Sequence, residues 1–358
     1  MNNSQLIAAT LFAAGLFCSG CKKETEIQIK EIDKKYSWSE VVGFFGLGKV
    51  ILSTGHSSRA IYLQQPNLFT RFTSQNLLED KVSCINPVSD VRVRMAIGAQ
   101  IFAYPETDTT LAICRNDEPL NYVSYVPLKR FDQTAVRLDT HLFNLSKCMA
   151  INENNYVLAP YDNNRPGRPH TFLLAAVTPG AVGSGPMLVR TQQVVIPRTV
   201  PSGAYVRNLV AIDDYFLVNM ADAGIYKINQ DGTFRQVHGP ALADTFYKWQ
   251  NTVYAPVEYN QILTSTNDGD TWQMATGTPL EFTLANYYQV RDSLVGVHSG
   301  IIYSLRWNGP RYTMRILKND GLGQTTITGI ECLHDTVYVA TTSGLFARPA
   351  TSFFESKQ

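Results

Sequence analysis

Charge is scarce in this sequence. Asp, Glu, Lys and Arg make up 17% of its residues, whereas about 25% is usual in soluble domains. The 31 basic and 30 acidic side chains leave a formal net charge of +1, without a long run of Lys or Arg. A chain that binds nucleic acid carries a basic patch or stripe, so we expect no nucleic-acid partner. Because 44% of the residues are hydrophobic, the composition also excludes a disordered chain and a coiled coil.

Catalytic and metal-binding signatures are missing as well. The sequence contains no Walker-type glycine loop, no H-E-x-x-H, no G-x-S-x-G and no Rossmann fingerprint after a strand. The six histidines are scattered singly, at His56, His141, His170, His238, His298 and His334. We therefore expect no metal and no cofactor, and we favour a protein that is not an enzyme.

Tryptophan is rare, with four residues against 18 Tyr and 17 Phe. This excess of Tyr and Phe favours strands over helical bundles. The length of 358 residues would suit two average domains, but all-β chains of this size often form one. The cysteines beyond the N-terminal region match no zinc pattern and either pair as disulfides or stay free in strands: Cys84, Cys114, Cys148 and Cys332.

The N-terminus contains a targeting segment. The apolar run from Leu6 to Phe17 is too short to span a bilayer, which needs about 20 residues. Small residues then lead to Cys21, and the stretch Leu16-Phe17-Cys18-Ser19-Gly20-Cys21 resembles a bacterial lipoprotein signal. The resemblance implies that residues 1–20 are removed and that Cys21 carries a lipid. The alternative is an ordinary cleaved signal, with Cys18 and Cys21 as a C-x-x-C redox pair.

The residues after Cys21 extend this interpretation. The charged stretch Lys22-Lys23-Glu24-Thr25-Glu26 resembles the one that sends some Bacteroidota lipoproteins to the cell surface. We therefore expect an outer-membrane lipoprotein in the cell envelope, facing either the periplasm or the outside. The lipid would be its only contact with the membrane.

A strand–turn–strand pattern recurs along the chain. An apolar strand ends in a polar turn and is followed at once by a strand rich in Val, Tyr, Phe and Ala. Asp and Asn suit such turns because they tolerate positive φ. The clear copies are 210–218, 247–255, 289–297 and 332–340, and weaker ones are 45–52, 96–103 and 150–158.

A third and usually a fourth strand follow each copy, for example at 223–228 and 311–316. Seven units give a period of about 48 residues, near that of propeller blades. We predict a single all-β domain over residues 36–358, a seven-bladed β-propeller of four-stranded antiparallel blades, with six or eight blades as alternatives. Residues 21–35 would form the lipidated tether and the closing strand, because Glu26-Ile27-Gln28-Ile29-Lys30 alternates at period two. We expect a monomer.

One turn motif resembles a known family. Ser265-Thr266-Asn267-Asp268-Gly269-Asp270-Thr271-Trp272 resembles the Asp-box of sialidase-type and BNR-repeat propellers, with Asn267 in place of the usual Asp. The resemblance implies a structural turn between third and fourth strands, built by Ser265, Asn267, Gly269, Thr271 and Trp272. Residues 229–234 and 307–312 look like degraded copies at equivalent positions.

Propeller ligands usually meet the loops between second and third strands and those between successive blades. The stretch from Asp162 to His170 is the longest of these loops and is rich in Asn and Arg, which suit carbohydrate hydroxyls or carboxylates. The candidate ligand-binding residues are His56, Arg59, Asp162, Asn164, Arg165, Arg168, His170, Asp222, Glu258, Tyr259 and His298.

Three functions stay open. The favoured one is recognition of a glycan or protein partner by the loop face. The second is a glycan-active, sialidase-like enzyme of the Asp-box class, with Arg165, Arg168, Glu258 and Tyr259 near the substrate. The third is an assembly-factor scaffold with a broad loop-face patch.

Overall fold

The computed structural model describes most of the chain from residue 38 on. The described ranges are 38–43, 50–53, 60–65, 68–73, 80–82, 96–97, 100–115, 123–138, 149–181, 183–198, 205–221, 223–243, 245–257, 261–275, 286–308, 311–322, 326–341 and 344–357. All of them belong to the larger of the two compact units into which the chain divides, which begins at residue 37. Cys21, Cys84 and Cys148 lie outside the described residues.

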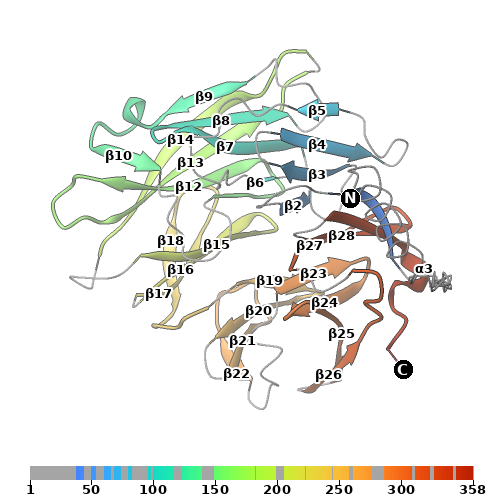
Figure 1. The fold of residues 1–358 in the computed structure, drawn as a ribbon. Coiled ribbons are helices and arrows are strands. Elements are labelled where there is room, and N and C mark those ends of the chain that lie inside the picture. Colours follow the sequence, from blue (N-terminus) through green and yellow to red (C-terminus); the bar gives the residue numbers. More distant parts are fainter. Residues whose placement is uncertain are drawn as a thin grey trace, which may run out of the picture. The chain divides into compact units, whose positions relative to one another are not determined.

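The secondary structure of the described residues is almost entirely β. Strands β1 to β29 form seven antiparallel sheets, six with four strands and one with five. Two short helices accompany them, η1 (Leu128–Arg130) and α3 (Ala350–Phe353). Figure 1 shows the strands of each sheet following one another along the chain, as in a meander.

The sheets follow the chain in order. The first three are β2 (Val50–Ser53), β3 (Ala60–Gln65), β4 (Leu68–Thr73) and β5 (Asp80–Val82); β6 (Ala96–Ile97), β7 (Ile101–Thr107), β8 (Thr110–Arg115) and β9 (Ser124–Pro127); and β10 (Ala135–Leu138), β11 (Ala150–Ile151), β12 (Tyr156–Asn163), β13 (His170–Thr178) and β14 (Met187–Ile196). The next two are β15 (Val206–Ile212), β16 (Tyr215–Met220), β17 (Gly224–Ile228) and β18 (Phe234–His238); and β19 (Tyr247–Trp249), β20 (Thr252–Val257), β21 (Gln261–Ser265) and β22 (Gln273–Ala275). The last two are β23 (Asn286–Val290), β24 (Ser293–His298), β25 (Ile301–Asn308) and β26 (Arg311–Ile316); and β27 (Ile327–Leu333), β28 (Thr336–Thr341), β29 (Gly344–Pro349) and β1 (Ser39–Gly43).

The four clear copies of the repeat are hairpins, as predicted. In each, two residues connect the first strand of a sheet to the second, because the flanking residues pair directly, as Ile212 does with Tyr215. The first turn residue has positive φ in every case, at Asp213, Gln250, Arg291 and His334. Each turn contains Asp or Asn, as predicted, but only Asp213 places it at the residue with positive φ, and the other three turns have it at the second residue, as Asn251, Asp292 and Asp335. Strand pairing on both sides of the turn holds its first residue in the left-handed backbone conformation. This conformation costs about 1–2 kcal/mol for a residue other than glycine.

The weaker copies have mixed outcomes. Residues 96–103 and 150–158 form the predicted hairpins, between β6 and β7 and between β11 and β12. The hairpin predicted at 45–52 is wrong, because β1 pairs with β29 whereas β2 pairs with β3. The segment between β1 and β2 therefore joins two different sheets. The first hairpin between the first and second strands of one sheet is β2–β3.

An N-terminal strand completes the last sheet, but it is not the predicted one. β1 pairs with β29 from Ser39 opposite Ala347 to Gly43 opposite Gly344. Figure 1 shows this blue strand beside the red C-terminal strands. The assignment of residues 26–30 to this position is wrong, because β1 occupies it. Residues 26–30 themselves lie outside the described part.

Trp38 fixes the start of this strand. Its side chain is 3% exposed, and its ring meets that of Phe353 in α3 edge-on at 5.9 Å. Its Nε1 donates a hydrogen bond to the carbonyl of Lys318 at 3.2 Å. The guanidinium of Arg348, itself 2% exposed, lies 5.8 Å from the centre of the Trp38 ring.

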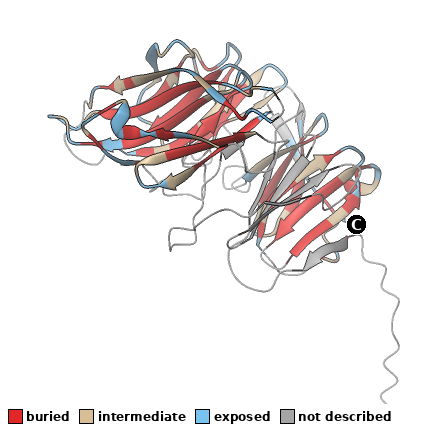
Figure 2. Cartoon of the chain, turned by 90° about the horizontal axis from the view of Figure 1, so that it is seen from above, coloured by how far each residue is buried: buried red, intermediate tan, exposed pale blue. Residues whose placement is uncertain are grey.

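Apolar and aromatic side chains on the middle strands form the core. Figure 2 shows the buried residues concentrated along these strands. Buried Tyr and Phe on second and third strands include Phe102, Phe172, Phe216, Tyr226, Tyr254, Tyr303, Tyr338 and Phe346. This agrees with the excess of Tyr and Phe over Trp in the composition. Cys114 and Cys332 are free thiols, and burial raises the pKa of Cys114 to about 12.

The turn that resembles an Asp-box joins β21 to β22, the third and fourth strands of their sheet. Asn267 Oδ1 accepts hydrogen bonds from the Thr271 backbone N–H at 3.0 Å and the Ser265 hydroxyl at 2.9 Å. The Ser265 Oγ accepts from the Gly269 N–H at 2.9 Å. Trp272 packs with Phe246 against a core cluster to which the β15–β18 sheet also contributes. These contacts hold the backbone of the turn and anchor it to the core.

The same chemistry recurs in the β17–β18 turn. Asp231 Oδ1 accepts from the backbone and hydroxyl of Thr233 at 2.8 and 2.6 Å, and Gly232 has a φ of 84°. In the third copy, the β25–β26 turn, Asn308 pairs with Arg311. All three turns therefore occupy the third-to-fourth position, as the sequence predicts.

Gly269→Ala is expected to lower the free energy of unfolding by about 1–2 kcal/mol. Gly269 has a φ of 80°, and an added Cβ would lie 3.1 Å from Leu217 Cδ2. Urea unfolding would measure the loss. Gly239→Ala is the matched control, since its backbone is ordinary and nothing lies within 4 Å of an added Cβ. Equal midpoints for the two variants would contradict a strained turn.

Candidate functional site

The strand order defines two ends of each sheet. In an antiparallel meander the first-to-second and third-to-fourth connections lie at one end, here named the turn end. The second-to-third connections lie at the other, here named the loop end. The sequence predicts that the ligand-binding residues lie at the loop end.

Several of these residues fall in connections outside the described part of the chain. Asp222, Glu258 and Tyr259 lie outside the described residues, in the connections β16–β17 and β20–β21. His56 and Arg59 also lie outside the described residues. They fall in the β2–β3 connection. That connection joins first and second strands, so their assignment to the loop end is wrong, and the misplaced hairpin at 45–52 is the cause.

A polar network braces the β12–β13 loop. Asp132, whose side chain is 4% exposed, pairs with Arg165 Nη2 at 3.0 Å. It also accepts hydrogen bonds from the Tyr161 hydroxyl at 2.8 Å and the Thr134 hydroxyl at 2.6 Å. Arg165 further donates to Gln193 on β14 at 2.7 Å. Arg165 therefore links its own loop, which follows β12, to the segment that precedes β10.

The other candidates in this loop differ in their surroundings. Asp162 pairs with Arg137 on β10 at 2.9 Å. His170 is 9% exposed, and burial followed by the charge of Arg198 lowers its pKa to about 4. The side chains of Asn164 and Arg168 are exposed and form no hydrogen bond or ion pair with the part of the chain that the structure describes. They are therefore the two members of the loop that remain open to a ligand.

His298 is placed apart from this loop, at the end of β24. Its ring Nε2 lies 3.2 Å from the Ser299 hydroxyl. The structure therefore groups Asp162, Asn164, Arg165, Arg168 and His170 around the β12–β13 connection, with Asp162 near the end of β12 and His170 at the start of β13, and it places His298 on a different sheet.

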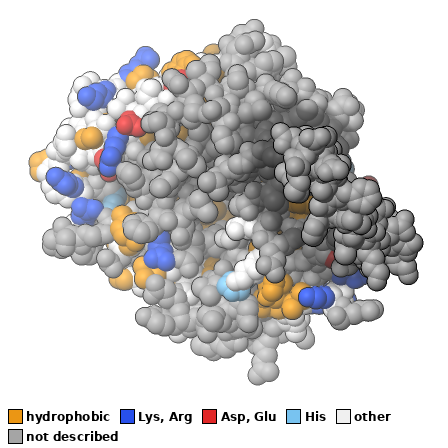
Figure 3. Space-filling view, viewed as in Figure 1, with side chains coloured by type: hydrophobic (Ala, Val, Ile, Leu, Met, Phe, Trp, Pro, Cys, Tyr) orange, Lys and Arg blue, Asp and Glu red, His pale blue; other side chains and the backbone are white. Residues whose placement is uncertain are grey.

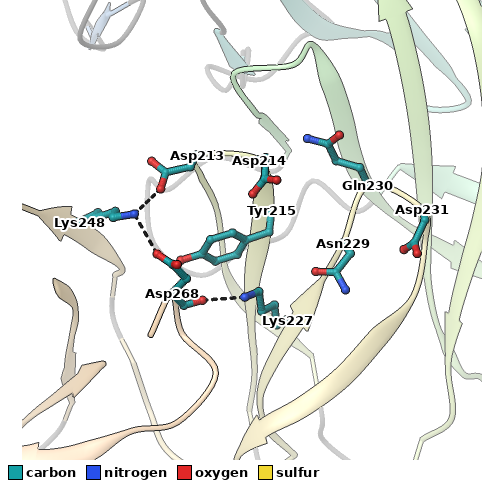
Figure 4. A pocket seen from close by; sticks show the side chains of 9 residues that line it. All are labelled: Asp213, Asp214, Tyr215, Lys227, Asn229, Gln230, Asp231, Lys248 and Asp268. Atoms are coloured by element: carbon teal, nitrogen blue, oxygen red, sulfur yellow. Dashed lines mark hydrogen bonds and ion pairs between the residues drawn. The ribbon is translucent and has the colours of Figure 1, made fainter. Parts of the chain in front are cut away.

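A cavity of about 490 Å³ opens at the turn end, between the β15–β18 and β19–β22 sheets. The β15–β16 turn contributes Asp213 and Asp214, and Tyr215 follows them. The β17–β18 turn contributes Asn229, Gln230 and Asp231, and the remaining lining comes from Lys227, Lys248 and Asp268. Figure 4 shows these side chains converging from both sheets.

Two lysines hold this cavity's walls together. Lys248 Nζ binds Asp268 at 2.9 Å and also contacts Asp213. Lys227 Nζ binds Asp270 at 2.7 Å and lies 4.2 Å from the centre of the Tyr215 ring. Burial alone would lower the pKa of Lys248, but the hydrogen bonds that it donates to Asp213 and Asp268, together with the negative charges of these carboxylates, outweigh burial and raise that pKa. Lys248 is therefore charged, and the ammonium groups of both lysines bind carboxylates of the protein.

Tyr215 is the buried member of this site. Its side chain is 4% exposed, and its hydroxyl has no hydrogen-bond partner among the described residues. Burial, followed by the charges of Asp268 and Asp213, raises the pKa of Tyr215. The hydroxyl is therefore neutral at physiological pH and available as a donor.

Sequence reasoning missed this cavity. Residues 213–214 stand out in the sequence only as a hairpin turn, and Asp268 only as part of the box. The signal that could have indicated it is an acidic residue in the third-to-fourth turns of neighbouring repeats, Asp231 and Asp268.

Three further kinds of site bear on function: a metal centre, a membrane-spanning helix and a basic patch. They contain no group of three or more His, Cys, Asp or Glu side chains placed to hold a metal ion. Within the same residues, no helix has the length and apolar character needed to cross a membrane. On the face seen in Figure 3, the described Lys and Arg side chains lie in separate small groups and form no broad patch.

Comparison with family models and with curated proteins finds no match. Solved structures do match. The chain is similar to the β-propeller domain of Myceliophteria thermophila Cps50 (Swd1), at 8% identity and a TM-score of 0.54, over 87% of this chain and 99% of that one. It is similar to YCF48 bound to a D1 peptide, at 10% identity and a TM-score of 0.50, over 87% and 96% of the two chains.

Raptor of Chaetomium thermophilum is similar at 11% identity and a TM-score of 0.51, over 87% of this chain and 29% of that one. At these identities the likenesses show the fold alone. The chain is nearly all-β, it consists of antiparallel and mostly four-stranded sheets, and its structural neighbours are β-propellers.

Proposed function

We propose that the chain is a seven-bladed, Asp-box-type propeller that binds a partner through its loop end as a lipid-anchored protein of the bacterial envelope. Support for the blade number comes from the seven sheets of the described residues. Support for closure comes from β1, which pairs with β29 of the last sheet. Anchoring at Cys21 rests on the signal-like sequence before it.

The braced β12–β13 loop is the observation that carries the binding function. Arg165 is held by Asp132 and Gln193, and Asp162 is held by Arg137. A loop that is already ordered binds with a smaller entropy loss. The loop therefore presents Asn164 and Arg168 on a stiff support, as a recognition surface requires.

The same contacts argue against the glycan-active alternative. A sialidase-like site needs arginines that are available to the carboxylate of the substrate. Arg165 already binds the carboxylate of Asp132 at 3.0 Å, and Asp162 is committed to Arg137. Binding is therefore better supported than hydrolysis. An amide–guanidinium pair suits a protein partner that presents carboxylates and backbone carbonyls, or a glycan acid.

A binding and turnover assay tests this function. The purified chain would be applied to a glycan array, incubated with sialidase substrates, and used to capture envelope proteins. We expect specific retention of a partner without turnover, and a loss of about tenfold in affinity in Asn164→Ala and Arg168→Ala. Lys357→Ala, an exposed basic residue outside this loop, is the matched control. Turnover of a glycoside, or retention that both loop variants leave unchanged, would overturn the proposal.

A further inference from the structure

The cavity at the turn end is not used by the proposed function, which concerns the loop end. It is lined by four carboxylates, those of Asp213, Asp214, Asp231 and Asp268, against the two ammonium groups of Lys227 and Lys248. Because carboxylates outnumber ammonium groups, the lining attracts a cation and repels an anion.

The ion pairs leave part of this negative charge uncompensated. Lys248 is engaged by Asp213 and Asp268, and Lys227 is engaged by Asp270. Within the described residues, Asp214 and Asp231 form no ion pair. Asp231 binds the backbone and hydroxyl of Thr233 in its own turn through Oδ1. The carboxylate of Asp214 is exposed and is the group best able to take an external cation.

Two buried donors in the same cavity also lack partners. The Tyr215 hydroxyl, on a side chain that is 4% exposed, and the Gln230 Nε2 have no acceptor among the described residues. Figure 4 shows the Tyr215 ring extending toward Asp268 and the Gln230 amide pointing into the space beside Asp214. Buried donors are nearly always paired in folded proteins. A ligand that supplies hydrogen-bond acceptors would complete both.

The required ligand therefore carries a cation and acceptor oxygens together. A lysine or arginine residue within a peptide has both, because its side chain is charged and its flanking backbone presents carbonyls. A polyamine offers only donors, and a neutral sugar offers no charge. We propose that this cavity binds a lysine or arginine side chain of a peptide segment, with Asp214 receiving the cation and with Tyr215 and Gln230 donating to peptide carbonyls.

Isothermal titration of the full chain tests this site. The probes are blocked tripeptides of sequence Gly-Lys-Gly and Gly-Arg-Gly, a norleucine counterpart without the charge, spermidine, and a neutral disaccharide. We expect the two basic peptides to bind and the other three probes to bind at least about tenfold more weakly. Equal binding of the norleucine peptide or spermidine, binding of the disaccharide alone, or no binding of either basic peptide would overturn the proposal.

Variants locate the binding. Asp214→Asn and Tyr215→Phe are each expected to weaken the basic peptides by about five- to tenfold. Asp292→Asn is the matched control, because Asp292 holds the same position in the β23–β24 turn. Since the Tyr215 hydroxyl has no hydrogen-bond partner among the described residues, Tyr215→Phe should leave the melting temperature unchanged, and a large drop would overturn its assignment as a ligand donor. Asn164 and Arg168 variants should not affect this binding, so failure here is distinguishable from failure at the loop end.

Discussion

Trp38→Ala is expected to lower the free energy of unfolding by about 3–5 kcal/mol. The substitution removes an indole that is 3% exposed and leaves a cavity against Phe353. It also removes the hydrogen bond to the carbonyl of Lys318 and the ring beside the Arg348 guanidinium. Arg348 is 2% exposed, so its buried charge would lose the attraction of the aromatic ring. The start of β1 would then be released from the C-terminal segment.

Urea unfolding followed by circular dichroism would measure this loss. Trp38→Phe is the matched control, since it keeps most of the packing and removes the N–H donor, and we expect it to cost about 1–2 kcal/mol. If Trp38→Ala unfolded at the same urea concentration as the unmodified chain, the contacts at the start of β1 would not contribute to stability.

Asp132→Ala is expected to cost about 3 kcal/mol at neutral pH. The substitution leaves the Tyr161 hydroxyl and the Arg165 guanidinium without their carboxylate, and Tyr161 is 4% exposed. Leaving a buried donor or charge without a partner costs more than the original interaction contributes. Asp162→Ala is the control, because the Asp162–Arg137 pair is about half exposed and should contribute less than about 1 kcal/mol.

The loss in Asp132→Ala should depend on pH. Burial alone would raise the pKa of Asp132, but the hydrogen bonds from Thr134 and Tyr161 and the charge of Arg165 outweigh it and lower that pKa. A carboxyl group with a lowered pKa in the folded state contributes its stability above its unfolded pKa of about 3.9. That contribution disappears as the pH falls through the folded-state value. The difference between the variant and the unmodified chain should therefore shrink in acid, and a constant difference would contradict an ionised Asp132.

Local features of this fold could be predicted from the sequence. The hairpin at Val210–Val218 shows an apolar strand, a polar turn and a second apolar strand, and short-range pairing follows such patterns closely. The box around Asn267 likewise satisfies its own hydrogen bonds within a few residues. Neither feature depends on which distant segment lies nearby.

Features that depend on distant partners could not be predicted in the same way. Residues 26–30 alternate more regularly than β1, but alternation does not tell which strand edge a segment will pair with. The sequence predicts that Arg165 faces a ligand, whereas its partner Asp132 lies 33 residues earlier in a connection with no motif. The cavity forms only where turns from two sheets lie side by side, and the packing of one sheet against the other determines whether they do.

The pairing of β1 with β29 has a consequence for biosynthesis. A chain is made from its N-terminus, so β1 emerges early, whereas β29 is among the last strands to be completed. Long-range pairing of this kind is slow because a large loop must close first. During translation, every other sheet can form from contiguous strands, and the last one must wait for both ends of the domain. An early stop or a proteolytic cut near residue 344 would therefore leave β1 without its partner strand, and an unpaired strand edge of this kind favours aggregation.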